Sequence, residues 1–184
     1  MLNGEAVVAS GERELKLNLG ACDRAFEGFT SVDLCPPADI VTDLALPWPW
    51  EDSTVSEVRA HDVIEHIEDF CRCCAHLRGG VRSGRIHFWN ELHRVLKPGG
   101  IATIETPNAA RGAGFYQDPT HANPFCLNSF QYIQDKSFAV QRLAASYGVT
   151  ARFEILDLDE AVYRDTHEDV WKITAVLKAI KKQA

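Results

Sequence analysis

The chain has 184 residues, which is enough for one domain with a sizeable buried core and too few for two. Its composition, 46% hydrophobic and 24% charged, is globular and excludes disordered and fibrous classes. The net charge of −7 disfavours nucleic acid as a partner, and no apolar run approaches the roughly 18 residues of a membrane span. The first residues lack the pattern of a signal peptide, so we expect a cytoplasmic protein.

The first third of the chain predicts four strands separated by short connections. Alternating apolar residues indicate strands over 15–20 and 29–34, a short strand within 38–44 and a fourth strand over 55–64. The prolines of LPWPW, residues 46–50, end the third strand, and the two tryptophans there are better explained by packing than by contact with a substrate. Only about ten residues separate the first two strands, so a single turn or an irregular loop must connect them.

The rest of the chain predicts helices followed by further strands. Apolar residues at helical spacing indicate a helix over 85–96, which Pro98-Gly99-Gly100 stops. A strand over 100–108, one or two helices within 127–148 and two consecutive strands over 152–159 and 169–180 follow. This order favours a single α/β domain over residues 1–184, with about seven mostly parallel strands, helices on both faces and an antiparallel last strand. Residues 1–13 are expected to form a flexible or peripheral segment.

Six cysteines are scattered through the chain, and one stretch gathers three of them. Cys71, Cys73 and Cys74 lie close to His76, but C-x-C-C lacks the paired C-x₂-C spacing of common zinc sites. Neighbouring residues on one helix also do not face a common point. We therefore expect reduced cysteines in a helix-and-loop segment, and no metal.

Polar side chains stand where the predicted strands end, and ligands bind beyond the carboxyl ends of strands in open α/β sheets. Asp33 follows the second strand, where mononucleotide-binding folds hold a ribose diol, although aspartate also caps turns there. Asp43 is a site residue or a turn residue, and His61 is a site residue or a half-buried histidine. Glu65 and His66 are explained by the start of a helix. Further polar residues at these ends are Asp62, Glu105, Thr106 and Asn108 and, in the loop after the fifth strand, Asp118, Thr120 and His121.

These segments, in this order, resemble the class I S-adenosylmethionine-dependent methyltransferases, in particular small bacterial and phage-type members. The resemblance rests on LNLGACD, SVDL, VTDLALPWPWEDSTVSEV, HDVIEHI, ELHRVLKPGGIATIETPN and DPTHANPFCLNSFQYI, and it covers roughly residues 14–135. It implies a Rossmann-like, doubly wound sheet with a reversed last strand, S-adenosyl-L-methionine as cofactor, and methyl transfer to an acceptor. A very short first connection is also similar to small members of this family.

The resemblance also implies which residues hold the cofactor. It assigns the methionine part to Gly20, Ala21 and Cys22 with His61 nearby, the ribose to Asp33, and the adenine to Asp43 and Leu44. The family usually has glycine at the position of Cys22. If the turn needs a positive φ there, a side chain costs about 1–2 kcal/mol, whereas a negative φ would accommodate cysteine.

A general base is needed only for an acceptor that must lose a proton early, such as a hydroxyl. His121 is the first candidate, because a neutral imidazole accepts a proton near pH 7, and Asp118 is placed to orient it or the substrate. His61 is the second candidate. A hydrogen bond that locks the loop explains His121 equally well.

Two other functions compete with methyl transfer. Cys22 and the lack of an evident cap domain favour a non-catalytic binding or interaction module. An NAD(P)-dependent oxidoreductase would need G-x-G-x-x-G before a long helix, a pattern that the chain lacks. The acceptor is not identified, but the acidic charge favours a small molecule, a sugar or a protein over nucleic acid. The oligomeric state stays open, although the apolar last strand offers a pairing edge.

Overall fold

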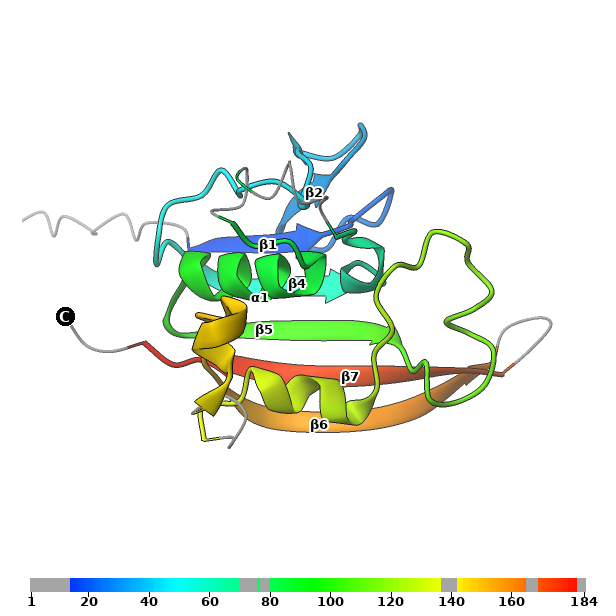
Figure 1. Cartoon of the computed structure of the whole chain (residues 1–184). Coiled ribbons are helices and arrows are strands. Elements are labelled where there is room, and N and C mark those ends of the chain that lie inside the picture. The colour runs from blue at the N-terminus through cyan, green and yellow to red at the C-terminus, as the bar shows by residue number, and fades with distance from the viewer. Residues whose placement is uncertain (1–13, 70–75, 77–79, 137–141, 165–168, 182–184) are drawn as a thin grey trace, which may run out of the picture.

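Figure 1 shows the computed structural model, which describes residues 14–69, 76, 80–136, 142–164 and 169–181. Its sheet has seven strands in the order β3-β2-β1-β4-β5-β7-β6. The pairs among β1 to β5 are parallel, and β7 is antiparallel to both of its neighbours. The prediction of a mostly parallel seven-stranded α/β sheet is confirmed. The segment 1–13 and the cysteines at 71, 73 and 74 lie outside the described residues.

The strands and helices have the following bounds. The sheet consists of β1 (Leu15–Leu19), β2 (Thr30–Asp33), β3 (Ile40–Val41), β4 (Val55–His61), β5 (Leu96–Pro107), β6 (Phe153–Arg164) and β7 (Asp169–Ala179). The helical elements are α1 (Gly84–Val95) and the 3₁₀ turns η1 (Ile64–His66), η3 (Leu127–Tyr132) and η4 (Ala144–Tyr147). Turns connect β1 to β2, as expected. Within the described ranges, no helix is long and apolar enough to cross a membrane.

The structure differs from the sequence-based expectation in the segment after β5. Where the chain is described, the span 127–148 contains the short 3₁₀ turns η3 and η4, and Arg142 is α-helical. The chain leaves η3 to pair with the start of β6: the Phe153 N–H donates to the Ile133 carbonyl, and the Asp135 N–H donates to the Phe153 carbonyl, both at 2.9 Å. The expected pairing edge is also wrong, because β7 lies between β5 and β6 and the edge strand is β6.

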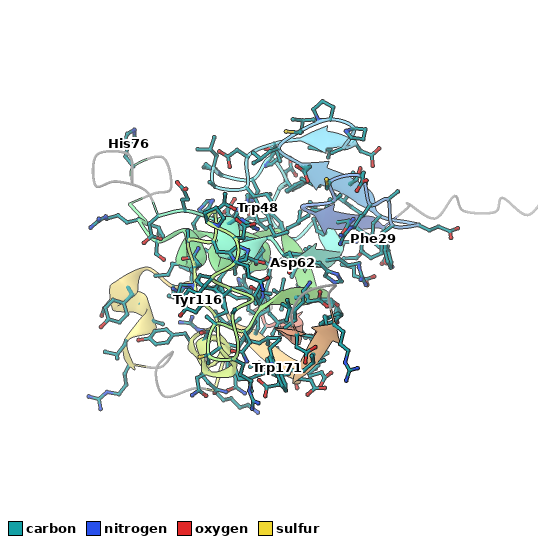
Figure 2. The ribbon with its side chains drawn as sticks, turned by 90° about the vertical axis from the view of Figure 1, so that its right-hand side faces the viewer. Phe29, Trp48, Asp62, His76, Tyr116 and Trp171 are labelled. Atoms are coloured by element: carbon teal, nitrogen blue, oxygen red, sulfur yellow. The ribbon has the colours of Figure 1, made fainter. Side chains whose placement is uncertain are left out.

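One face of the sheet carries the hydrophobic core. Buried strand residues such as Leu17, Val58 and Ile104 pack with Phe88 and Trp89 of α1. The helices α1, η3 and η4 all lie on this face, whereas Figure 2 shows side chains and no described helix on the other. The expectation of helices on both faces therefore does not hold for the described residues, because the connections before β2 and β3 are too short for a crossover helix.

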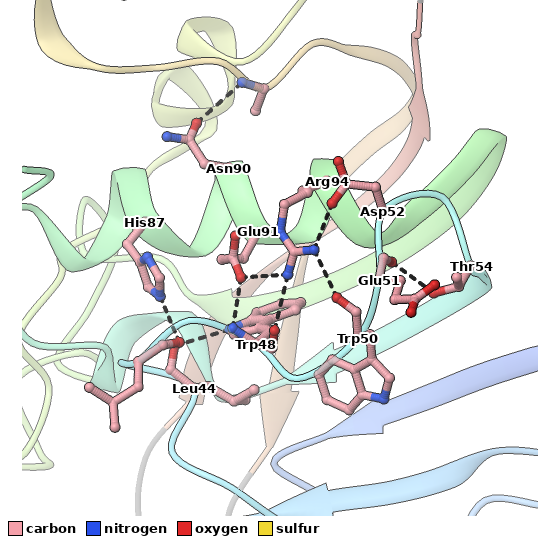
Figure 3. A network of polar contacts seen from close by, with 12 residues as sticks. Leu44, Trp48, Trp50, Glu51, Asp52, Thr54, His87, Asn90, Glu91 and Arg94 are labelled. Carbon is pink, nitrogen blue, oxygen red and sulfur yellow. Dashed lines mark hydrogen bonds and ion pairs between the residues drawn. The ribbon is translucent and has the colours of Figure 1, made fainter. Parts of the chain in front are cut away.

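The segment between β3 and β4 is held against α1 by a polar network (Figure 3). The Arg94 guanidinium donates to both carboxylate oxygens of Glu91 at 2.8 Å, and to the carbonyls of Trp48 and Trp50 at 3.1 and 2.8 Å. Glu91 in turn accepts the Trp48 N–H at 2.7 Å. The Trp48 side chain is 4% exposed and packs on Phe88, so its predicted packing role is confirmed.

Candidate functional site

A cavity of about 330 Å³ lies beyond the carboxyl ends of the parallel strands, where the strand order reverses between β1 and β4. Open α/β sheets bind their ligands at such a reversal. We call this space the switch-point cavity. Its walls include Gly20, Cys22, Asp33, Asp43, Leu44, Asp62, Val63 and His66. Most of the residues predicted to hold the cofactor are therefore brought together.

Gly20 and Cys22 shape the turn after β1 with left-handed backbone conformations, φ +63° and +49°. A Cβ at Gly20 would collide with the Val63 side chain, so glycine is required there for space as well as for conformation. Cys22 is exposed, and its N–H donates to Asp33 Oδ2 at 2.7 Å. The cysteine thus occupies the conformation that favours glycine.

Asp33 ties this turn to the end of β2. Besides the Cys22 N–H, its carboxylate accepts the N–H of Leu34 at 2.7 Å and that of Cys35 at 3.3 Å, both on Oδ1. A carboxylate has about four acceptor positions, so one remains for a ligand hydroxyl. Asp33 is therefore a turn cap and a wall of the cavity at once.

Asp43 and Leu44 form the wall next to β3. Asp43 Oδ1 accepts the Ala45 N–H at 2.8 Å, which makes Asp43 a turn residue as well as a cavity residue. Leu44 is 6% exposed, and its carbonyl accepts the indole N–H of Trp48 at 3.1 Å. The network around α1 thus fixes the backbone that closes this side of the cavity.

Two of the predicted site residues lie elsewhere. Ala21 and His61 line a second hollow with Asn18, Phe26 and Arg59 on the polar face of the sheet, and Gly20 lines both this hollow and the switch-point cavity. His61 is half-buried, and burial lowers its pKa. Neither residue lines the switch-point cavity, so their predicted cofactor contacts find no support in the cavity walls, while the next residue, Asp62, does line it.

A second cavity, of about 520 Å³, adjoins the first. We call it the loop cavity, because the loop after β5 forms much of its wall. Its lining residues include Asp62, His66, Gln117, Asp118, His121 and Lys172. Asp62 and His66 also line the switch-point cavity, so the two spaces share a wall. The predicted pair Asp118 and His121 lies in the loop cavity.

The histidines of this wall are held by their Nδ1 atoms. His121 Nδ1 lies 2.6 Å from the Phe115 carbonyl, and His66 Nδ1 lies 3.0 Å from Thr120 Oγ1. Burial lowers the pKa of His66. Hydrogen bonds from Thr120 lower the pKa of Asp118, whose Oδ2 lies 3.9 Å from His121 Nε2. His121 therefore fixes the loop with one ring nitrogen, Nδ1, while its other ring nitrogen, Nε2, lies near the loop cavity.

Lys172 of β7 braces the shared wall from the polar face of the sheet. Its ammonium lies 2.6 Å from Asp62 Oδ2 and 3.0 Å from Glu105 Oε1. Burial alone would raise the pKa of Glu105, but the bonds from Lys172 and Tyr163 outweigh it and the pKa is lowered. Asp62 Oδ1 is buried, and none of the described residues forms a hydrogen bond with it.

Glu65 lies behind this wall and is fully buried. Its Oε2 accepts the Thr106 hydroxyl at 2.9 Å, whereas Oε1 has no hydrogen-bond partner in the described part of the chain. Burial raises its pKa to about 8. Sequence reasoning assigned Glu65 and His66 to a helix start and gave Lys172 no role. HDVIEHI at the end of β4 was an available signal for the first two, whereas nothing local marks Lys172.

Comparison with known proteins supports the fold. No protein-family model and no curated protein matches the chain. A methyltransferase from Methanosarcina mazei described as S-adenosylmethionine-dependent has a TM-score of 0.58 at 13% identity, with 98% of this chain and 100% of that chain covered. The N-methyltransferase NodS from Bradyrhizobium japonicum, solved with S-adenosyl-L-homocysteine, has a TM-score of 0.55 at 12% identity, with 91% and 79% covered.

A third similar structure shows that this fold carries more than one chemistry. The [4+2]-cyclase SpnF has a TM-score of 0.52 at 16% identity, with 90% of this chain and 75% of that chain covered. Function must therefore be argued from the site. The shared architecture itself is clear: the chain has the fold of the class I S-adenosylmethionine-dependent methyltransferases.

Proposed function

We propose that the chain binds S-adenosyl-L-methionine in the switch-point cavity and transfers its methyl group to an acceptor in the loop cavity. The observation that carries this proposal is the shared wall of Asp62 and His66, which places two cavities side by side at the reversal of the sheet. Methyl transfer needs two adjoining binding spaces, because donor and acceptor must meet in line.

The residues of the switch-point cavity fit such a cofactor. Its volume of about 330 Å³ is in the range of small-ligand sites. Asp33 offers its remaining carboxylate acceptor position to a ribose hydroxyl, and Leu44 offers an apolar wall beside Asp43 for the adenine. The bound cofactor supplies an activated methyl group on a sulfonium, so the protein has to bind, orient and exclude water. Asp62 and His66 are placed to hold the methionine end toward the acceptor.

The loop cavity favours a polar acceptor. Carboxylates, imidazoles and one ammonium dominate its wall, which suits a small molecule or sugar with hydroxyl groups better than nucleic acid. His121 remains our proposed residue for contact with the acceptor, with Asp118 beside it. We propose that both residues act on the acceptor. His61 lies outside both cavities, so we propose His66 in its place as the second candidate base.

Calorimetric titration with S-adenosyl-L-homocysteine tests the cofactor cavity. We expect one site per chain, and Asp33→Asn should weaken binding at least about tenfold, because a neutral amide replaces the charged acceptor for a ribose hydroxyl. Asp39→Asn is the matched control: Asp39 also accepts a backbone N–H, from Ser31 at 2.8 Å, but does not line the cavity. Equal losses in both variants would mean that only the loop is damaged, and the cavity assignment would fail.

A non-catalytic module is the second candidate, favoured by the left-handed Cys22 in the cavity wall. It predicts no response to S-adenosylmethionine, to its demethylated product or to NAD in a thermal-shift assay. Methyl transfer predicts stabilisation by the first two. Formation of S-adenosyl-L-homocysteine from a panel of small hydroxylated acceptors, followed by mass spectrometry, then separates binding from turnover.

A further inference from the structure

Glu65, His66 and His121 converge at the shared wall of the two cavities. One ligand atom of each residue lies within 4.8 Å of those of the other two. Two of the residues belong to η1, and the third comes from the loop after β5. The Glu65 carbonyl fixes that loop, because it accepts the N–H of Ala122 at 2.7 Å and of Asn123 at 2.9 Å. The backbone therefore sets the spacing of the cluster.

Hydrogen bonds place the protons of both rings on Nδ1. His121 Nδ1 must donate, because its partner is the Phe115 carbonyl. The Thr120 hydroxyl donates its only proton to Asp118 Oδ1 at 2.6 Å, so at 3.0 Å it can only accept from His66 Nδ1. In the neutral rings Nε2 then carries the lone pair in both histidines. Histidine ligands of metals are oriented in the same way, by donating the other ring N–H to a carbonyl or hydroxyl.

Glu65 supplies the third side chain of the cluster. It also gives an independent reason to expect a bound ion there. The side chain is 0% exposed, and Oε1 has no hydrogen-bond partner among the residues that the structure describes. A buried oxygen without a partner is destabilising, and native structures avoid it unless an ion or water satisfies it. Both histidines line the loop cavity, which gives the cluster an open side.

We propose that Glu65, His66 and His121 bind a divalent first-row transition-metal ion such as Zn²⁺ or Co²⁺. Two imidazoles with one carboxylate are a donor set for such ions, whereas Mg²⁺ and Ca²⁺ prefer oxygen ligands. Ligands of an ion at ~2.1 Å stand about 3–3.5 Å apart, so small side-chain rotations must close the cluster. The nearby Lys172 ammonium is bound by Asp62 and Glu105, which limits its repulsion of the ion.

The open positions of the ion would face the loop cavity, which both histidines line. Oxygen groups of an acceptor can occupy such positions, so the site suits a hydroxylated acceptor. This last point rests on the proposed function, whereas binding of the ion does not. When the ion is bound, His121 is one of the ligands of the metal. The metal would then raise the acidity of an acceptor hydroxyl.

Titration of the chelator-treated full chain with Zn²⁺ tests the site, followed by calorimetry and by metal analysis after dialysis. The background carries Cys71→Ser, Cys73→Ser and Cys74→Ser, so that these thiols cannot supply the ligands. We expect one Zn²⁺ per chain, with Co²⁺ bound at the same stoichiometry and Mg²⁺ not bound. Glu65→Gln and His121→Gln should each weaken Zn²⁺ binding at least about tenfold. His93→Gln, which removes a histidine on α1, should leave it unchanged.

The outcomes separate this inference from the proposed function. Absence of Zn²⁺ binding in the background, or binding that both ligand variants retain, would overturn the site. Should Glu65→Gln fail to fold, as judged by circular dichroism, His66→Gln takes its place. Titration with S-adenosyl-L-homocysteine in the same samples reports on the cofactor cavity: its failure beside intact Zn²⁺ binding contradicts the proposed function alone.

Discussion

The turn after β1 contains two left-handed residues, and only one of them is glycine. Gly20 is there because no side chain fits against Val63. Cys22 has open surroundings, so its strain is purely conformational. The sequence marked Cys22 as a departure from the family pattern but did not reveal its backbone angle.

Cys22→Gly should stabilise the protein by about 0.5–1 kcal/mol. Removing the side chain relieves about 1–2 kcal/mol of left-handed strain, and the greater freedom of unfolded glycine takes back part of it. The Cys22 N–H, which Asp33 accepts, is kept. Urea unfolding measures the change, and S-adenosyl-L-homocysteine titration shows whether affinity rises with it.

Cys35→Gly is the matched control for this prediction. Cys35 is also exposed and also donates its N–H to Asp33, but it is not among the residues with positive φ. Glycine there has no strain to relieve and should lower stability by a few tenths to about 1 kcal/mol. Equal effects of the two substitutions would show that conformation at Cys22 is not the cause.

The residues of the candidate site differ in how far their positions could be predicted from the sequence around them. Asp33 and Asp43 could be predicted, because each directly ends a strand of a parallel sheet and such ends meet at one edge. The side chain of His61 lines the hollow beside Arg59 and not the switch-point cavity, because successive side chains of a strand point to opposite faces, and its site role stays a prediction. Lys172 could not be predicted, since it meets Asp62 only through the pairing of β5 with β7.

The helix α1 helps to position the candidate site, although the helix itself lies outside the site. Arg94, near its C-terminal end, binds the carbonyls of Trp48 and Trp50 and the carboxylate of Glu91 at once. These bonds fix the segment from Leu44 onward, and Leu44 is a wall of the switch-point cavity. The helix itself was predictable from its apolar spacing. This polar anchoring was not, because the partners lie more than 40 residues apart.

Arg94→Met should cost about 2–3 kcal/mol of stability, because the half-buried Glu91 loses its charged partner and two carbonyls lose their donor. The ion pair and hydrogen bonds with Glu91 raise the pKa of Arg94, so no pH near neutrality removes them. Urea unfolding measures the loss. Lys178→Met, which breaks only the exposed pair with Glu154, should cost less than about 1 kcal/mol. Similar losses in both variants would refute the anchoring role.

For the whole molecule, the number of strands and their mostly parallel direction could be predicted from the alternation of elements, whereas the covering of the two faces could not. The helices α1, η3 and η4 cover one face (Figure 1), and half-buried polar residues such as Lys16, Arg59 and Thr174 alternate along their strands with the buried core residues. Half-buried polar and charged groups therefore lie on the face of the sheet opposite the core. Half-buried histidines occur in β4 (His61), at the cavities (His66) and on α1 (His93).

The buried histidines should lower the stability of the fold as the pH drops from 7.5 to 5.5. Burial lowers the pKa of His61, His66 and His93, so below about 6.5 the unfolded chain binds protons that the folded chain resists. Glu65 acts in the opposite direction, because its pKa of about 8 lets the folded state hold a proton that the unfolded state has lost. The histidine contribution is therefore measured at a single residue and not from the total stability.

His93→Gln isolates one of these contributions away from both cavities. The His93 Nε2–H donates to the Ile180 carbonyl at 3.0 Å, and glutamine can replace that donor. The variant should be less stable than the parent at pH 7.5, because the ring contact with Phe153 is lost. At pH 5.5 the deficit should shrink, since the parent alone loses the stability that a neutral His93 provides. Urea unfolding at both pH values, with chelator present, measures the two deficits, and equal deficits would show that His93 does not contribute to the acid sensitivity of the fold.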